Sequence, residues 1–272
     1  MAAVPARPDG GAAPSVLDAH LAHLAAALPS LRGCEELLAR WGAELAHRLA
    51  AGGRLLVAGN GGSAAEAQHL TAELVGKLRD DREPLSAIAL HAETSALTAI
   101  GNDYGYAEVF ARQVRAHGRP GDILLLLTTS GTSANLLAAA DAGRRAGLRC
   151  WAFTGPAPNP LADACHDTLA VASADGQVVQ ELHLLCAHVL CEYVDRVLPA
   201  ARAAAGPATV GPAGATVGAV GAPAGPVRAG VEVALDGGAD RPGGAEPVGA
   251  DPVEVALDGG TDRPVEAGRG GE

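Results

Sequence analysis

Two pairs of polar side chains occur at helical spacing in this sequence of 272 residues. His69 and Glu73 are four residues apart, so they share one face of a helix. Gln180 and His188 are two helical turns apart and also point roughly the same way. If the two helices converge, they supply two imidazoles, a carboxylate and an amide, a set that suits Zn²⁺ or acid–base chemistry. Taken singly, each of these residues is more often a packing or solvated side chain.

Two turns rich in glycine and hydroxyl groups have the composition of an anion-binding site. GNGGS (59–63) and TTSGTS (128–133) each follow an apolar segment and precede a helical one. Glycine lets the backbone approach a ligand, and hydroxyls and free N–H groups at a helix N-terminus donate to phosphate oxygens. Neither turn is a Walker loop, and the first is not the GxGxxG of a dinucleotide site. Either turn alone could be an ordinary helix start, but two on one sheet favour a phosphorylated small molecule.

A third motif, GNDYGY (101–106), is expected in a loop after a short helix. Asn102 and Asp103 could bind sugar hydroxyls there or could form an Asx-type turn, which uses the same side chains. The two uses are compatible.

Short apolar segments alternate with helical ones from residue 54 onward, which predicts an α/β fold with a parallel sheet covered on both faces. Five strands are expected in RLLVA, SAIAL, DILLLL, RCWAFT and TLAVA. Two helices are expected before them, at 15–28 and 30–51. Further helices are expected near 63–79, 94–100, 106–117, 132–146 and 176–197. Ligands bind beyond the carboxyl ends of parallel strands, where both glycine-rich turns are expected.

The predicted domain covers residues 15–198 and includes the N-terminal helices at 15–51. Residues 1–14 are rich in proline, glycine and alanine and are expected to form a disordered arm. Residues 199–272 are expected to be a disordered tail, because their Gly/Ala/Pro/Val-rich composition cannot supply a core. The tail holds a duplicated segment, VEVALDGGxDRP, which could instead be a short linear motif for a partner.

Charge and cysteine usage exclude several classes of protein. The net charge of −11 argues against a general binder of nucleic acid or anionic membranes. The five cysteines are odd in number and form no CxxC pair, which is typical of reduced thiols in a cytoplasmic protein. The sequence shows neither a signal-peptide core nor an apolar run approaching the ~18 residues of a membrane span.

Four segments together resemble the phosphoheptose isomerase family, which belongs to the sugar-isomerase (SIS) fold group. They are GNGGSAAEAQHLTAE, AIGNDYGY, LLLLTTSGTSANLLAA and VVQELHLLCAH, and the resemblance covers about residues 15–198. It implies a SIS-type, flavodoxin-like sheet of five parallel strands. It also implies conversion of sedoheptulose 7-phosphate to D-glycero-D-manno-heptose 7-phosphate, in the biosynthesis of nucleotide-activated heptose. A homotetramer with one zinc ion per subunit is implied as well.

The same resemblance implies roles for individual residues. Glu73 and His188 are expected to act on the proton that moves between C1 and C2 through an enediol, a reaction in which the oxyanion must also be stabilised. The expected metal ligands are His69, Glu73, Gln180 and His188. The expected contacts with phosphate or sugar are Asn60, Gly61, Gly62, Ser63, Glu73, Asn102, Asp103, Thr128, Thr129, Ser130, Ser133 and Gln180. The resemblance does not place His183 in the site, so it is expected to be structural.

A few positions depart from the pattern of the family, and they bear on substrate preference and rate rather than on reaction type. Lys77 stands where many relatives have arginine, so a bidentate contact becomes a point charge. Gln177 stands where some relatives have aspartate. Thr128 keeps the hydroxyl of the serine common in relatives, and Thr132 replaces an amide with a hydroxyl.

Two other functions fit the same phosphate turns. One is a non-catalytic SIS-domain regulator that binds a sugar phosphate or a protein, and the other is an isomerase of a different sugar phosphate. A binding protein has no need of a full acid–base set, so the presence of Glu73 and His188 favours an enzyme.

Overall fold

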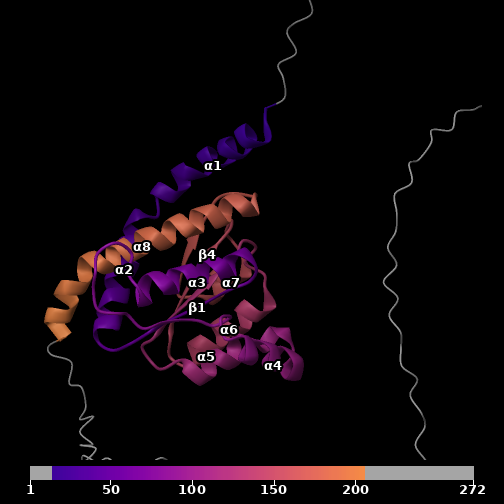
Figure 1. Cartoon of the computed structure of the whole chain (residues 1–272). Coiled ribbons are helices and arrows are strands. Elements are labelled where there is room, and N and C mark those ends of the chain that lie inside the picture. Colours follow the sequence, from indigo (N-terminus) through magenta and orange to yellow (C-terminus); the bar gives the residue numbers. More distant parts are fainter. Residues whose placement is uncertain (1–13, 206–272) are drawn as a thin grey trace, which may run out of the picture. The chain divides into compact units, whose positions relative to one another are not determined.

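Five short parallel strands form one sheet, in the order β2–β1–β3–β4–β5 (Figure 1). The computed structural model describes residues 14–205, so the expected tail duplication and nearly all of the expected arm lie outside the described residues. The strands are β1 (Leu55–Gly59), β2 (Ala87–Ala89), β3 (Ile123–Leu127), β4 (Arg149–Thr154) and β5 (Asp167–Ala170). Each overlaps a predicted segment, and the predicted fold class is confirmed.

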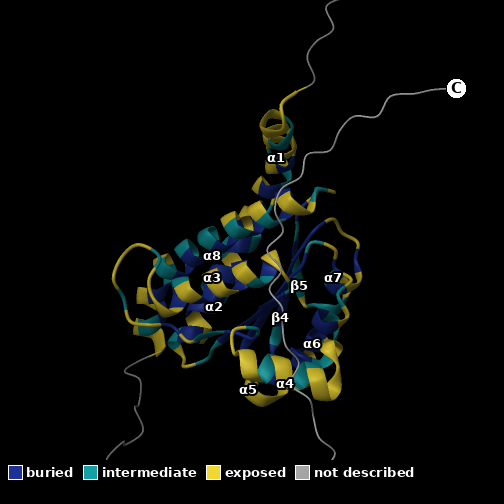
Figure 2. Cartoon of the chain, turned by 45° about the vertical axis from the view of Figure 1, so that its right-hand side comes forward, coloured by how far each residue is buried: buried dark blue, intermediate teal, exposed yellow. Residues whose placement is uncertain are grey.

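Helices cover both faces of the sheet, because alternate strand residues point to opposite sides. In β1, Leu55 and Val57 join one apolar cluster, and Leu56 and Ala58 join the other. The helices on the first cluster are α2 (Glu35–Ala50), α3 (Gly62–Val75) and α8 (Gly176–Ala205). Those on the second are α4 (Thr94–Tyr104), α5 (Ala111–His117), α6 (Ala134–Arg145) and α7 (Pro160–Ala164), with the 3-10 turn η1 (Tyr106–Glu108) beside them. Figure 2 shows the buried strands between these two layers.

The apolar face of α2 is buried within the chain. Trp41 stacks on Trp151 of β4, with ring centroids 4.5 Å apart, and its Nε1 donates to Asp167 Oδ2 at 3.0 Å. Gly42 faces Tyr193 of α8 so closely that a Cβ on Gly42 would lie 2.2 Å from Tyr193 Cβ. From the sequence, the helices at 15–51 are expected to carry more apolar surface than the α/β core requires and to bury it against other subunits. For α2 this expectation is wrong, because its apolar face is buried within the chain.

The helix α1 (Val16–Arg32) does keep exposed apolar side chains, among them Val16, Leu17 and Leu21. It extends away from the sheet in Figure 1 and is largely exposed in Figure 2. Two polar contacts connect it to the beginning of α8. His20 Nε2 lies 2.8 Å from Glu181 Oε1, and His23 Nδ1 lies 3.4 Å from Asp175 Oδ2.

Several predicted boundaries are wrong. The helix expected near 63–79 ends at Val75, and the one expected near 106–117 is divided into η1 and α5. The break expected at Pro29 falls at Gly33, because Ser30 donates its hydroxyl to Ala27 O at 2.7 Å and burial of Leu31 holds the last turn of α1. The last helix was expected to end near 197 and the disordered tail to begin at 199, but the helix runs to Ala205, since Leu198 and Ala201 are still buried. GNDYGY was expected in a loop, but its first four residues form the last turn of α4, and the chain leaves the helix only at Gly105, where φ is +84°.

Of the helices that the structure describes, none combines the length and apolarity needed to cross a membrane.

We predict that α1 mediates self-assembly. Changing Leu17 and Leu21 together to glutamate should shift the protein to smaller species, because charge would replace exposed apolar surface that a partner subunit covers. Light scattering at micromolar concentration measures the change. Ala116→Glu, at an exposed position of α5, is the control. An assembly state that the double variant leaves unchanged would contradict the prediction.

Candidate active site

The turn GNGGS connects β1 to α3 at the carboxyl edge of the sheet. Gly59 has no room for a side chain, because a Cβ there would lie 2.4 Å from the carbonyl oxygen of Ser63. Gly61 has φ +56°, a conformation that favours glycine. Ser63 is buried in the first turn of α3. The N–H groups of this turn lack carbonyl partners within the helix, so they can bind an anion.

The second turn, TTSGTS, leads from β3 into α6 and is supported from within. Thr128 is buried, and its Oγ1 accepts from the N–H groups of Ser130 and Gly131, at 3.3 Å each. Ser130 Oγ in turn accepts from Thr132 N at 3.3 Å. Ser133 caps α6 without using its hydroxyl on a helix N–H, which leaves that hydroxyl able to meet a ligand. The hydroxyl of Thr128 therefore shapes the turn, in addition to the ligand contact predicted for it.

A reciprocal pair of amides connects the first turn to the start of α6, directly after the second turn. Asn60 Nδ2 donates to Asn135 Oδ1 at 3.0 Å, and Asn135 Nδ2 donates to Asn60 Oδ1 at 2.8 Å. Tyr106 also donates its hydroxyl to Asn60 Oδ1, at 3.2 Å. Asn60, which belongs to the first turn, is thus bonded both to the start of α6 and to the GNDYGY motif. Asn135 and Tyr106 lie inside quoted motifs, but nothing in their spacing marks them as partners of Asn60.

The remaining ligand-contact predictions lie near this edge. Thr129 packs beside Gly155 and Gly176, the latter at the start of α8. Asn102 and Asp103 are exposed in the last turn of α4, where Asn102 Nδ2 donates to Asp103 Oδ1 at 2.9 Å. The structure therefore directs one of these two side chains toward the other. Whether they contact a sugar stays a prediction.

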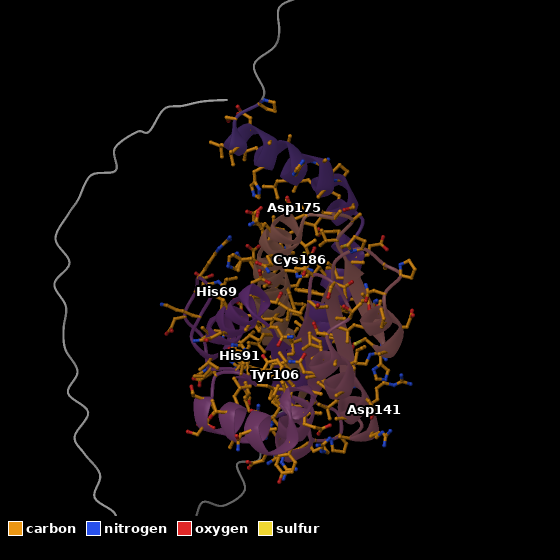
Figure 3. All side chains as sticks on the ribbon, turned by 90° about the vertical axis from the view of Figure 1, so that its right-hand side faces the viewer. His69, His91, Tyr106, Asp141, Asp175 and Cys186 are labelled. Carbon is orange, nitrogen blue, oxygen red and sulfur yellow. The ribbon has the colours of Figure 1, made fainter. Side chains whose placement is uncertain are left out.

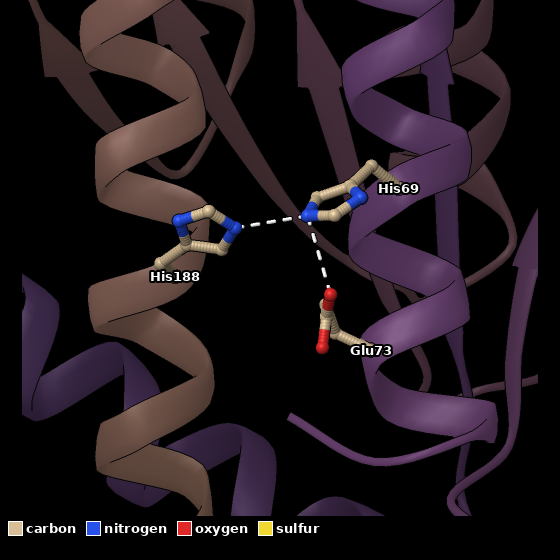
Figure 4. Close-up of side chains that lie close together, drawn as sticks. All are labelled: His69, Glu73 and His188. Carbon is tan, nitrogen blue, oxygen red and sulfur yellow. Dashed lines mark hydrogen bonds and ion pairs between the residues drawn. The ribbon is translucent and has the colours of Figure 1, made fainter. Parts of the chain in front are cut away.

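His69, Glu73 and His188 converge from α3 and α8 (Figure 4). His69 Nε2 lies 2.8 Å from His188 Nε2 and 3.2 Å from Glu73 Oε1. The side chains of His69 and Glu73 are 43% and 17% exposed, so solvent and ligands can reach the group. We call these three residues the trio. Figure 3 shows His69 at the surface of the domain.

The donor set of the trio fits a zinc ion. Two imidazole nitrogens and a carboxylate oxygen lie within 4.8 Å of one another. Tetrahedral zinc with ~2.0–2.1 Å bonds places two ligand nitrogens ~3.3 Å apart, so the imidazoles need to separate only slightly from their present contact. The same three groups can also pass a proton among themselves, because one imidazole must donate where the other accepts.

Gln180, the fourth predicted ligand, lies elsewhere along the helices. Its Oε1, Cδ and Nε2 surround Gly62, so that a Cβ on Gly62 would be 2.4 Å from Oε1. Gly62 precedes His69 by two turns of α3, or ~10 Å. The amide of Gln180 therefore packs against the first glycine-rich turn, and its role as a metal ligand stays a prediction.

Glu66 and His183 form a buried polar pair that the sequence did not predict. His183 is fully buried and its Nε2 donates to the carbonyl oxygen of Thr154 at 3.1 Å, which leaves Nδ1 facing Glu66 Oε2 at 4.0 Å. Burial raises the pKa of Glu66 to about 8 and lowers the pKa of His183 to about 4. Glu66 therefore carries a proton near neutral pH, beside the trio on the same helix.

Glu66 also lines an open cavity of about 500 Å³ between α1, α3 and α8. The other lining residues are His20, Gln177, Gln180, Glu181 and Leu184. Gln177, one of the departures from the family pattern, thus lies beside Gln180, whereas Lys77 is exposed after the end of α3. His183 was expected to be structural, and its burial and its bond to Thr154 agree with that role.

Comparison with known proteins connects this geometry to one family. Residues 31–155 match the family model described as SIS domain. A phosphoheptose isomerase of Streptomyces coelicolor is 60% identical over 179 residues, which cover 66% of this chain and 78% of the relative. One from Rhodospirillum rubrum is 44% identical over 168 residues, covering 62% and 89%. The solved structure of phosphoheptose isomerase GmhA from Neisseria gonorrhoeae is 38% identical with a TM-score of 0.60, covering 67% of this chain and 100% of its own.

The buried pair makes stability depend on pH. The raised pKa of Glu66 adds stability that is lost as pH rises from 4.5 to about 8, and the lowered pKa of His183 removes stability as pH falls from 6.5 to about 4. The two trends oppose each other up to pH 6.5, which leaves a net loss of stability between pH 6.5 and 8.

We predict that Glu66→Gln abolishes this loss. Urea unfolding at several pH values measures it, and Glu36→Gln at an exposed position is the control. A decline between pH 6.5 and 8 that persists in Glu66→Gln would contradict the assignment.

Proposed function

The chain belongs to the phosphoheptose isomerase family, and we propose that its trio interconverts sedoheptulose 7-phosphate and D-glycero-D-manno-heptose 7-phosphate through an enediol. The observation that carries the proposal is the convergence of His188 of α8 with His69 and Glu73 of α3. The helix α3 begins at the glycine-rich turn GNGGS. The chain is an isomerase, as its relatives are named. The proposed product would enter nucleotide-activated heptose biosynthesis.

The two glycine-rich turns bind the phosphate in this proposal. The hydroxyls of Ser63, Thr129, Ser130 and Ser133 and the N–H groups of Gly61 and Gly62 supply donors. The positive ends of the α3 and α6 dipoles add to their attraction for an anion. This local arrangement overcomes the overall charge of −11, because helix-terminal N–H groups act at hydrogen-bond distance while the net charge is screened by salt.

Glu73 and His188 move the proton between C1 and C2 in this proposal. Glu73 Oε1 faces His69, and the second carboxylate oxygen points away from both imidazoles in Figure 4, where it can receive a proton from the substrate. His188 then supplies or takes up the proton on oxygen, and His69 holds the two groups in line. Zn²⁺ bound by the trio would supply a Lewis acid for the enediol oxygen, with Gln180 as the further oxygen ligand implied by the family.

The separation between the turns and the trio supports a long sugar phosphate. Gly62 and His69 are two helical turns apart, ~10 Å along α3. A seven-carbon chain whose phosphate is held at the turn reaches the trio with its other end, whereas a shorter chain falls short. Asn60, Asn102, Asp103 and Gln180 are proposed to contact the sugar.

We further propose that the protein is a homotetramer with active sites near subunit boundaries. We also propose that it is located in the cytoplasm. The exposed apolar side chains of α1 support the assembly, and all five cysteines are free thiols, which supports a reducing compartment. A regulator that only binds a sugar phosphate, or an isomerase of another sugar phosphate, is the alternative that the following tests separate.

The substrate range tests the proposal. Sedoheptulose 7-phosphate should be isomerised with a higher kcat/KM than five- and six-carbon ketose phosphates, because only the longer chain spans from the turns to the trio. Purified protein is assayed on each ketose phosphate. A higher kcat/KM on a six-carbon substrate overturns the heptose assignment, and binding without turnover of any sugar supports the regulator.

Two substitutions separate proton transfer from binding. Glu73→Gln keeps the shape of the side chain but not its basicity, so turnover should fall by at least ~10²-fold with little change in substrate affinity. Ser130→Ala should chiefly weaken binding, because it removes a phosphate donor and the acceptor for Thr132 N–H. Turnover assays and isothermal titration measure both effects, with Glu36→Gln as the control. Full activity of Glu73→Gln in metal-replete buffer would show that Glu73 is not the base.

A further inference from the structure

A largely buried arginine connects the two helices of the trio. Arg82 lies between α3 and β2, and its side chain is only 10% exposed. Its Nε donates to Asp195 Oδ1 of α8 at 2.7 Å. Its Nη2 donates to the carbonyl oxygen of Glu73 at 2.7 Å, and its Nη1 donates to that of Leu74 at 2.8 Å. One planar guanidinium therefore bonds to both helices at once.

On α3, Arg82 acts at the residue that bears the trio's carboxylate. The last carbonyls of a helix have no intrahelical donor, and a positive charge is favourable beside them. Glu73 supplies one of these carbonyls, so the guanidinium fixes the backbone of Glu73 itself. His69 lies one turn earlier on the same helix and is fixed with it.

On α8, Arg82 acts two turns beyond the third member of the trio. Asp195 follows His188 by seven residues, a spacing that puts both on one face of the helix. The charge-assisted bond from Arg82 to Asp195 is largely shielded from solvent. The guanidinium therefore bonds the C-terminal end of α3 to α8 at a point two turns beyond His188.

We propose that Arg82 is a positioning residue for the trio. Through the Glu73 carbonyl and Asp195, it holds His69 and Glu73 at the distance from His188 that proton transfer and metal binding need. The inference rests on the proposed isomerase function. Contacts that orient metal ligands in this way typically change metal affinity or activity by ~10–100-fold when they are removed.

The chain offers a matched control on the same two segments. Arg79 lies three residues before Arg82, and its Nη2 is 2.7 Å from Glu192 Oε1 of α8. The Arg79 side chain is 74% exposed, and within residues 14–205 its polar contact is with Glu192 rather than with a carbonyl of α3. Breaking this pair removes an ion pair to α8 without disturbing Glu73.

The test compares Arg82→Gln, Arg82→Lys and Asp195→Ala with Arg79→Gln in the full chain. We measure kcat and KM for sedoheptulose 7-phosphate well below the melting temperature, and Co²⁺ affinity of metal-free protein from its visible absorption band. Arg82→Gln should lower kcat and Co²⁺ affinity by ~10–100-fold with KM little changed, since the phosphate turns are untouched. Arg82→Lys should recover only part of the lost kcat and Co²⁺ affinity, because one ammonium group cannot make all the hydrogen bonds of the planar guanidinium. Arg79→Gln should behave as wild type.

Equal kcat and equal Co²⁺ affinity in Arg82→Gln and Arg79→Gln would overturn the inference. If Arg82→Gln does not fold, Asp195→Ala decides, because it removes the acceptor on α8 and leaves the carbonyl contacts of Arg82 in place. A lower kcat or lower Co²⁺ affinity in Asp195→Ala then supports the inference, and wild-type values of both overturn it. An inactive wild-type protein would refute the proposed function, whereas Co²⁺ affinity would still test Arg82.

Discussion

The parallel packing of α3 against α8 is the constraint on which the candidate site depends. Each helix follows a strand of the sheet, so both begin at its carboxyl edge and run in the same direction. Contacts then follow one another along the pair at a nearly constant offset, which is 119 residues between His69 and His188. Gly62 meets Gln180 at the start, and Glu66 meets His183 one turn later. A small rotation of either helix would separate all of these contacts together.

This arrangement produces a gradient of environments along one helix face. The N-terminal turn of α3 offers N–H groups to an anion, the middle holds a carboxyl group kept protonated by burial, and the C-terminal half presents imidazole and carboxylate to solvent. Backbone N–H groups, a neutral carboxyl group and ionisable side chains thus follow one another within three turns of α3. A sugar phosphate has the same order of groups, with an anion at one end, hydroxyls between and a carbonyl at the other.

Sequence pattern alone predicted the parts of the fold and site that rest on local spacing. The five strands follow from short apolar segments, of which β1 and β3 are buried on both faces, and His69 and Glu73 share a face because they are four residues apart. What it missed depends on partners far apart in the chain. In the sequence, Asn135 looks like a solvent-exposed residue, and only the fold places Asn60 beside it. Arg82 likewise looks like a charged loop residue, and only the fold brings acceptors from both helices to it. The packing of Gln180 on Gly62 was also not predicted, because the two residues are far apart in the sequence.

The reciprocal amide pair between Asn60 and Asn135 has a consequence for selectivity. It connects the first glycine-rich turn to the start of α6, directly after the second turn, before any ligand arrives, so the phosphate binding proposed for these turns would lose little conformational entropy to loop ordering. Such a preformed site would not by itself distinguish one phosphate monoester from another of similar size. Discrimination among sugars must then arise at the far end of the ligand, where a chain of the wrong length leaves buried polar groups without partners. Because one end of the site is rigid, selectivity among substrates depends on the contacts at the other end.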